Sequence, residues 1–161
     1  MAGRVAFVVA VSVWCSVVWS MPLTFLPSTC ETMLPQGLVA APQTSDAPFV
    51  LLVPEEMIPS GSEVNVVLAG FDPEVKFEGF FIEAYGASEQ PIGTFVTAPM
   101  KLDCGGPATA AYSADSTEKV VQMLSWKSPE NMKGTVTFRG TVIMNNEIFW
   151  VNVVSKKVML V

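Results

Sequence analysis

Most of the chain alternates between apolar and polar positions with the two-residue period of β-strands. The clearest case is the segment 135–144, where Val136, Phe138 and Val142 alternate with threonine and arginine side chains. Such alternation indicates a strand with one face toward a core and the other toward water. Further short apolar segments, bounded by turn-forming residues, cover residues 48–53, 63–71, 76–86, 93–99, 100–104, 119–126, 147–155 and 157–161.

Helical spacing is poor throughout, and Pro or Gly interrupts most long windows. Clusters of turn residues, such as SEQPIG at 88–93 and SPENMKG at 128–134, separate the strand candidates. About seven or eight short strands with regular turns predict an all-β fold, an antiparallel β-sandwich.

The segment KFEGFFIEAYG at 76–86 is the most aromatic part of the chain. A strand here would carry Phe77, Phe81 and Tyr85 on one face and Phe80, Ile82 and Ala84 on the other. Large side chains on both faces favour a central strand, with one face on the sandwich core and the other under a loop or a neighbouring strand. The alternative is a partly exposed aromatic patch, which would mark a binding surface.

The segment IFWV at 148–151 raises the same choice, because Phe149 and Trp150 face opposite sides of a strand. If Phe149 and Val151 fill the core, Trp150 is either covered by a loop or exposed. We therefore take Tyr85 and Trp150 as the candidate contact residues of a binding surface.

The first residues are typical of a secretory signal peptide. Residues 5–19 form an apolar run preceded by Arg4, and Val18 and Ser20 have the small side chains that suit the −3 and −1 positions. We predict a signal peptide over residues 1–20 with cleavage after Ser20, which gives a secreted, extracellular protein. The alternative is an uncleaved membrane anchor, but the run is shorter than the ~20 apolar residues of a spanning helix.

The predicted mature chain begins with a loosely held lead-in, residues 21–29, and continues as one domain, residues 30–161. Cys15 leaves with the signal peptide, so Cys30 and Cys104 remain. Two cysteines in an oxidising compartment most simply form one disulfide. A free thiol and an intermolecular bond are the alternatives.

Charge limits the kinds of partner. Removing Arg4 with the signal peptide leaves 8 basic and 15 acidic residues, a net charge of −7. Nucleic acid binding needs clustered Lys and Arg, and insertion into anionic membranes needs a basic amphipathic face. The sequence supplies neither, so we expect no nucleic acid partner and no membrane insertion.

The chemistry of the chain is mostly a set of absences. There is no histidine, which excludes imidazole bases, Ser-His-Asp systems and His-ligated metal or haem. If the two cysteines are paired, thiolate metal sites and redox catalysis are excluded as well. The neighbouring acids at 55–56 and at 72 and 74 lie beside prolines in turn-like segments. We therefore predict no catalytic residues, no metal and no cofactor: the protein is not expected to be an enzyme.

Several segments together resemble the reeler (reelin amino-terminal) domain family. They are CETMLP at 30–35, PQTS with a following PF at 42–49, FEGFFIEAYG with PIGTF at 77–95, LDC at 102–104, and WKSP with the later TVI and FWV at 126–151. The resemblance implies an immunoglobulin-like β-sandwich, with Cys30 and Cys104 as the family's disulfide pair. Many relatives have histidines where this chain has Gln36 and Tyr112, so any role of those histidines is absent here.

The chain resembles the short, single-domain insect defence proteins of this family most. That resemblance implies a secreted, non-enzymatic protein of innate immunity that recognises a microbial surface component, with antimicrobial action as one form of that role. The alternative is an extracellular adhesion or matrix-type module that binds another protein through a sheet face or an open edge.

Overall fold

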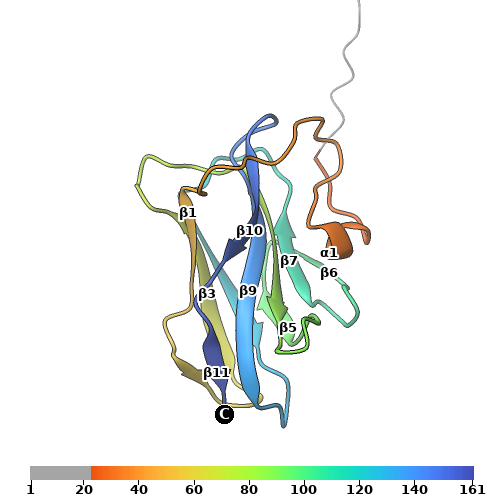
Figure 1. Cartoon of the computed structure of the whole chain (residues 1–161), viewed down its shortest axis with the longest axis vertical. Coiled ribbons are helices and arrows are strands. Elements are labelled where there is room, and N and C mark those ends of the chain that lie inside the picture. Colours follow the sequence, from red (N-terminus) through yellow and green to blue (C-terminus); the bar gives the residue numbers. More distant parts are fainter. Residues whose placement is uncertain (1–22) are drawn as a thin grey trace, which may run out of the picture.

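The computed structural model describes residues 23–161, which form two packed β-sheets and one short helix (Figure 1). The helix α1 (Thr29–Thr32) precedes all the strands and ends where Met33 adopts a left-handed conformation. The smaller sheet has four antiparallel strands. In order across this sheet they are β1 (Phe49–Leu52), β3 (Glu63–Gly70), β8 (Val121–Lys127) and β5 (Thr94–Thr97).

The larger sheet has seven strands. Six of them lie in the order β2 (Met57–Ile58), β11 (Val158–Leu160), β9 (Gly134–Ile143), β4 (Gly79–Tyr85), β7 (Ala110–Ser113) and β6 (Met100–Leu102). The seventh strand, β10 (Phe149–Val154), also pairs with β9. The sandwich fold expected from the alternation is confirmed.

Strands β10 and β11 lie one after the other along the same edge of the long strand β9. Between them Ser155 keeps the ladder continuous. Its backbone N–H donates to the carbonyl of Phe138 at 2.9 Å, and its hydroxyl accepts the N–H of Phe138 at 3.0 Å. One strand therefore supports two consecutive partners.

The strand count differs from the expectation. Residues 23–161 contain eleven strands, because β2 and β7 have no counterpart among the predicted segments. β2 is two residues long, and β7 reads AAYS, whose small side chains give no alternation signal. β2 also pairs with β11 in parallel, so the sandwich is not wholly antiparallel.

The main core lies between the two sheets and is built on aromatic contacts. Trp126 of β8 meets Phe138 of β9 edge to face, with ring centroids 5.2 Å apart. The indole N–H of Trp126 donates to the carbonyl of Ile92 at 3.2 Å. Gly93 has a φ of +71°, and a Cβ there would lie 2.3 Å from the Trp126 ring, so this close approach requires glycine.

A second apolar cluster covers the outer face of the larger sheet. Phe81 of β4 and Phe149 of β10 contribute to it from the sheet. Phe25 and Met33 come from residues 23–40, which we call the N-terminal segment. Phe25 is only 3% exposed, and its ring stacks on Phe81 with centroids 5.5 Å apart. Within the predicted lead-in, Phe25 thus completes a buried cluster and Leu23 packs against it, while Thr24 and residues 26–28 are exposed.

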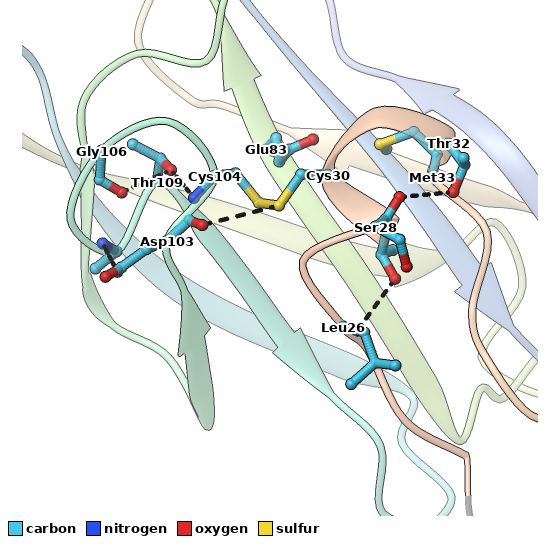
Figure 2. Close-up of a disulfide and its surroundings, with 12 residues drawn as sticks. Leu26, Ser28, Cys30, Thr32, Met33, Glu83, Asp103, Cys104, Gly106 and Thr109 are labelled. Carbon is cyan, nitrogen blue, oxygen red and sulfur yellow. Dashed lines mark hydrogen bonds between the residues drawn. A yellow bond between two sulfur atoms is a disulfide. The ribbon is translucent and has the colours of Figure 1, made fainter.

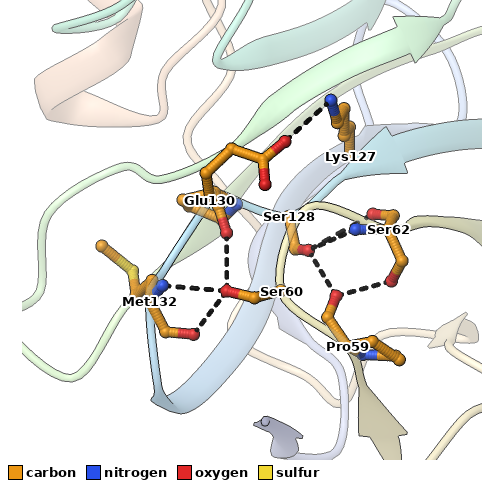
Figure 3. A network of polar contacts seen from close by, with 8 residues as sticks. Pro59, Ser60, Ser62, Lys127, Ser128, Glu130 and Met132 are labelled. Carbon is orange, nitrogen blue, oxygen red and sulfur yellow. Dashed lines mark hydrogen bonds and ion pairs between the residues drawn. The ribbon is translucent and has the colours of Figure 1, made fainter.

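Hydroxyl groups tie together two turns at the end of the molecule near the C-terminus (Figure 3). The Ser128 hydroxyl donates to the carbonyl of Pro59 at 2.8 Å and accepts the N–H of Ser62 at 3.1 Å. The N–H of Met132 donates to the Ser60 hydroxyl at 2.9 Å. These contacts fix the turn before β3 against the turn before β9.

The predicted signal peptide, residues 1–20, and its cleavage site lie outside the described residues. Within residues 23–161, no helix has the length and apolarity needed to cross a membrane.

Candidate functional site

Strand β4 presents two different faces. Phe80, Ile82 and Ala84 point into the core between the sheets, and Phe81 points into the outer cluster. The strand is thus buried on both faces, with the N-terminal segment as the cover, as the core interpretation predicted. Phe77 does not share the face of Phe81, because it lies before β4, bridges Lys119 and packs in the main core.

A disulfide joins Cys30 of α1 to Cys104 in the loop between β6 and β7. Their Cα atoms are 5.4 Å apart and their sequence separation is 74 residues. The predicted intramolecular pairing is therefore confirmed. The bond fastens the N-terminal segment onto the outer face of the larger sheet (Figure 2).

The loop that carries Cys104 is held by its own side chains. The Asp103 carboxylate accepts the N–H of Ala108 at 2.7 Å, and the Thr109 hydroxyl accepts the N–H of Cys104 at 2.8 Å. Gly105 has a φ of +85°, a value that suits glycine. This turn, which is not part of a strand, positions the Cys104 sulfur close to Glu83 of β4.

Glu83 of β4 lies directly beneath the disulfide (Figure 2). Its carboxylate oxygen and both sulfurs all lie within 4.8 Å of one another. The side chain is 0% exposed. One carboxylate oxygen accepts the Tyr85 hydroxyl at 2.6 Å, and the other has no hydrogen-bond partner. Burial raises the pKa of Glu83 to about 7, and the hydrogen bond from Tyr85 opposes this rise.

Tyr85 is half-buried and connects Glu83 to the surface. Burial, followed by its hydrogen bond to Glu83, raises the pKa of its phenol above the usual value. The Arg139 guanidinium lies over the ring, 4.8 Å from its centroid, and forms an ion pair with Glu89. The ring is thus fixed between a buried carboxyl group and a surface ion pair.

An open pocket of about 470 Å³ lies beside this group. We call it the disulfide pocket. Its wall includes Tyr85, both cysteines and the residues Pro27, Glu31, Glu89, Gln90, Pro91, Asp103 and Gly105. A second pocket, about 550 Å³, shares Glu89 with the first and is lined by Arg139, Asn152 and Lys157 among others. The charged side chains at the first pocket are thus all carboxylates, whereas the second pocket also has cationic side chains.

The structure removes Trp150 from the candidate surface. Its side chain is 8% exposed, meets Phe49 edge to face at 5.6 Å, and donates its indole N–H to the Ser45 hydroxyl at 3.3 Å. The register of β10 shifts between Trp150 and Val153, so both side chains enter the main core. Of the two candidate contacts, Tyr85 lines an open pocket, whereas Trp150 belongs to the main core.

The two positions of the family histidines lie under the N-terminal segment. Gln36 forms an isolated backbone bridge with Thr24, and the ring of Tyr112 meets Phe25 edge to face at 5.5 Å. Both residues help to seat this segment. Among the turn acids, the Asp72 carboxylate accepts the N–H of Glu74 at 2.8 Å, which is a local turn contact.

Among residues 23–161, one group of three potential metal-binding side chains converges, namely Cys30, Glu83 and Cys104. The two sulfurs are bonded to each other, so neither is the thiolate that binds metal ions.

Glu83 is the residue of this site that sequence reasoning missed. The available signal was an acid inside an otherwise apolar strand segment, two residues from Phe81 and two from Tyr85. An acidic side chain on the same face as two aromatic residues is rarely buried without a specific partner, so this position indicates a polar contact inside the fold.

The Reeler domain family matches residues 28–161. "Putative defense protein Hdd11-like" of Samia ricini is 29% identical over 160 residues, which cover 94% of this chain and 95% of the relative. "Putative defense protein 3" of Antheraea mylitta is 30% identical, with 95% and 94% covered. "Putative ferric-chelate reductase 1" of Danio rerio is 31% identical, but the match covers only 24% of that protein.

The fold also matches a solved structure. The crystal structure of the human F-spondin reeler domain gives a TM-score of 0.60 at 17% identity, covering 76% of this chain and 95% of that one. At this identity the match shows the shared sandwich fold. With the family match over almost the whole described region, it follows that this chain belongs to the Reeler domain family.

Proposed function

We propose that this chain is a secreted, non-enzymatic defence protein of innate immunity that recognises a microbial surface component through the disulfide pocket. The names of its insect relatives support the defence role. The observation that carries the recognition mode is the placement of Tyr85 at an open pocket, where Glu83 and Arg139 fix its ring.

A fixed aromatic ring suits recognition, because it offers contact area with little loss of conformational entropy on binding. The carboxylates of Glu31 and Asp103 lie on one side of Glu89, and the cations Arg139 and Lys157 lie on the other. Such a surface fits a microbial polymer that carries hydroxyl, amino and anionic groups. Lysis of membranes by a cationic helix does not fit a net charge of −7 after removal of Arg4.

Binding to whole bacterial cells and to purified cell-wall polymers tests the recognition proposal. Glu31→Lys reverses a charge at the rim of the disulfide pocket, and we expect it to weaken saturable binding at least about fivefold. Glu147→Lys makes the same charge change on an exposed turn away from the pocket and should leave binding unchanged. Equal effects of the two variants, or release of dye from anionic vesicles at micromolar protein, would contradict the proposal.

Secretion is tested separately. Intact mass of the protein from the culture medium should match a chain that begins at Met21. Retention of the protein in the membrane fraction with residues 1–20 attached would show that the apolar run is an anchor.

A second candidate function is an extracellular adhesion module that binds another protein. The outer face of the smaller sheet favours it, because Leu52, Val121 and Met123 are exposed there. Leu52 and Met123 both lie opposite Val67, on the strands at either side of it. Under this function Met123→Glu should abolish binding to host extracellular protein and leave binding to bacteria intact.

A further inference from the structure

The Cys30–Cys104 disulfide borders an open pocket on one side and a buried carboxyl group on the other. From the sequence, pairing of these cysteines was expected to exclude thiolate metal sites and redox catalysis. Yet an accessible disulfide with a proton donor beside it has what thiol–disulfide exchange requires, namely an approach for a thiolate and a way to neutralise the departing sulfur.

Access differs between the two sulfurs. Cys30 is half-buried, whereas Cys104 is 4% exposed and lies in a tightly hydrogen-bonded loop. A thiolate that enters the disulfide pocket therefore reaches the sulfur of Cys30 first, and the sulfur of Cys104 becomes the leaving group. The departing thiolate would form in a buried place, where an uncompensated negative charge is costly.

Glu83 is placed to supply the compensation. Both sulfurs lie within 4.8 Å of its carboxyl group, and one of its two oxygens has no other partner. The remaining oxygen is held by the Tyr85 hydroxyl at 2.6 Å, which fixes the carboxyl group under the sulfurs. Burial keeps a large fraction of Glu83 protonated near neutral pH, because its pKa is raised to about 7.

We propose that the Cys30–Cys104 disulfide is a thiol–disulfide exchange site for dithiol partners, in which the carboxyl group of Glu83 protonates the departing sulfur of Cys104. The inference concerns a stoichiometric reaction and does not depend on the proposed recognition function.

The exchange proceeds in two steps. A thiolate of the partner attacks the Cys30 sulfur and forms a mixed disulfide. The bond between Cys30 and Cys104 breaks at the same time, and its electron pair goes to the Cys104 sulfur. This sulfur then takes the proton of Glu83. The second thiol of the partner gives its proton to solvent and attacks the partner's own sulfur in the mixed disulfide. Cys30 then leaves as a thiolate and is protonated by solvent in the pocket. The partner dithiol is oxidised to a disulfide, and Cys30 and Cys104 are reduced to thiols.

The charged and titratable groups around Glu83 set how the reaction responds to pH. They are Tyr85 on the same strand, Arg139, which lies opposite Glu83 on β9, Glu31 on α1, and Asp103 in the loop before Cys104. Tyr85 donates to Glu83, and Arg139 is engaged by Glu89 and the Tyr85 ring. The carboxylates of Glu31 and Asp103 lie at the pocket wall, where their negative charge repels an approaching thiolate.

The test is the rate of reduction of the folded, mature protein by dithiothreitol between pH 5 and pH 9, followed by alkylation and mass spectrometry. Each rate constant is divided by the thiolate concentration of the reagent. We expect the corrected rate constant to be constant at low pH and to fall as pH rises through about 7, where Glu83 loses its proton.

Two variants assign that pH dependence. Glu83→Gln should remove the fall of the corrected rate constant near pH 7, and should lower this constant at pH 6 on the order of tenfold or more. Tyr85→Phe deletes the hydrogen bond that favours ionised Glu83. The fall should therefore remain in this variant, with its midpoint moved to higher pH. If Glu83→Gln fails to fold, the shift in Tyr85→Phe still tests the proposal.

Glu31→Gln is the matched control, because it removes a carboxylate from the same pocket without touching Glu83. It should raise the corrected rate at all pH values and leave the shape of the profile unchanged. A flat profile in the unaltered protein, or the same profile in Glu83→Gln, would overturn the proposal. So would a rate that becomes independent of reductant concentration and equals the rate of global unfolding, because reduction would then need unfolding.

Discussion

The two faces of strand β4 are both covered but differ in what covers them. The inner face, Phe80, Ile82 and Ala84, meets the opposite sheet and contains only hydrocarbon. The outer face places Phe81, Glu83 and Tyr85 under a short segment that a disulfide fastens. A sheet-to-sheet contact excludes water by itself, whereas a loop cover leaves room for a titratable group. Burial of the inner face thus stabilises the fold, whereas burial of the outer face encloses the titratable carboxyl group of Glu83.

Truncating one aromatic side chain on each face should give the largest effect. Phe80→Ala should lower the free energy of unfolding by about 3–5 kcal/mol, because the rigid sandwich core cannot close around the cavity. Phe81→Ala should cost less, because the segment that carries Phe25 can move toward the gap. Urea unfolding of both variants measures the difference, and a larger loss for Phe81→Ala would reverse our view of the two faces.

Removing the disulfide should weaken the outer face selectively. The chain-entropy treatment of a loop of this length gives about 4.5 kcal/mol, and measured losses fall at ~2–5 kcal/mol. We expect Cys30→Ser with Cys104→Ser to lose an amount in that range, measured by urea unfolding. Hydrogen exchange should accelerate in residues 23–40 and stay slow in the smaller sheet. Uniform acceleration would show that the cover and the core unfold as one unit.

The outer face should also make stability depend on pH. The folded pKa of Glu83 is raised from 4.5 to about 7, so folding opposes its ionisation. The stability that depends on protonated Glu83 is fully present below pH 4.5 and is lost as pH rises through about 7. The loss amounts to about 3 kcal/mol at 1.36 kcal/mol per pKa unit.

Glu83→Gln should abolish this loss and be more stable than the unaltered protein at pH 8. Unfolding by urea at several pH values from 4 to 9 measures it. Asp72→Asn, in an exposed turn, is the control and should follow the unaltered protein over this range. Parallel pH profiles of the unaltered protein and Glu83→Gln would show that Glu83 ionises freely in the folded state.

The smallest expected effect is at the rim of the outer face. Arg139→Ala removes both the contact with the Tyr85 ring and the ion pair with Glu89, and should cost about 1 kcal/mol. Lys76→Ala removes an exposed ion pair with Glu118 that has no aromatic partner, and should lower the stability less than Arg139→Ala does. Thermal unfolding in low and high salt compares the two, and equal losses would mean that the ring contact adds nothing.

The inner face was predictable from sequence, and most of the outer face was not. Alternation identified β4 and β9 because their side chains face a flat, continuous core. The cover by Phe25 was missed because residues 23–29 have no period of their own and are ordered only by what they touch. Trp150 was misplaced because β10 is buried on both faces, with Phe149 in the outer cluster and Trp150 in the main core. The register shift after Trp150, where Asn152 has a φ of +57°, brings Val153 into the main core as well. A bulge of this kind reverses the side-chain alternation that the prediction assumed.

The disulfide pair could be inferred from two cysteines and the predicted oxidising compartment, but its chemical surroundings could not. Glu83 was visible in the sequence as an acid within an apolar strand. Its proximity to Cys30 and Cys104 depends on three segments that are distant along the chain. Pairwise proximity of this kind arises from the fold, and no local pattern in one sequence reports it.

Strand β11 has a consequence for the order in which the molecule is assembled. It lies between β9 and β2, and within the described part of the chain β11 is the one strand that pairs with β2. Residues 57–58 therefore gain their strand partner only when residues 158–160, far along the chain, pair with them. Such distant pairing pays a large loop-closure entropy and slows folding. Until residues 158–160 pair, the edge of β9 that β11 occupies stays open to pairing with other chains. The folding intermediate without β11 is therefore the state of this molecule most exposed to edge-to-edge aggregation.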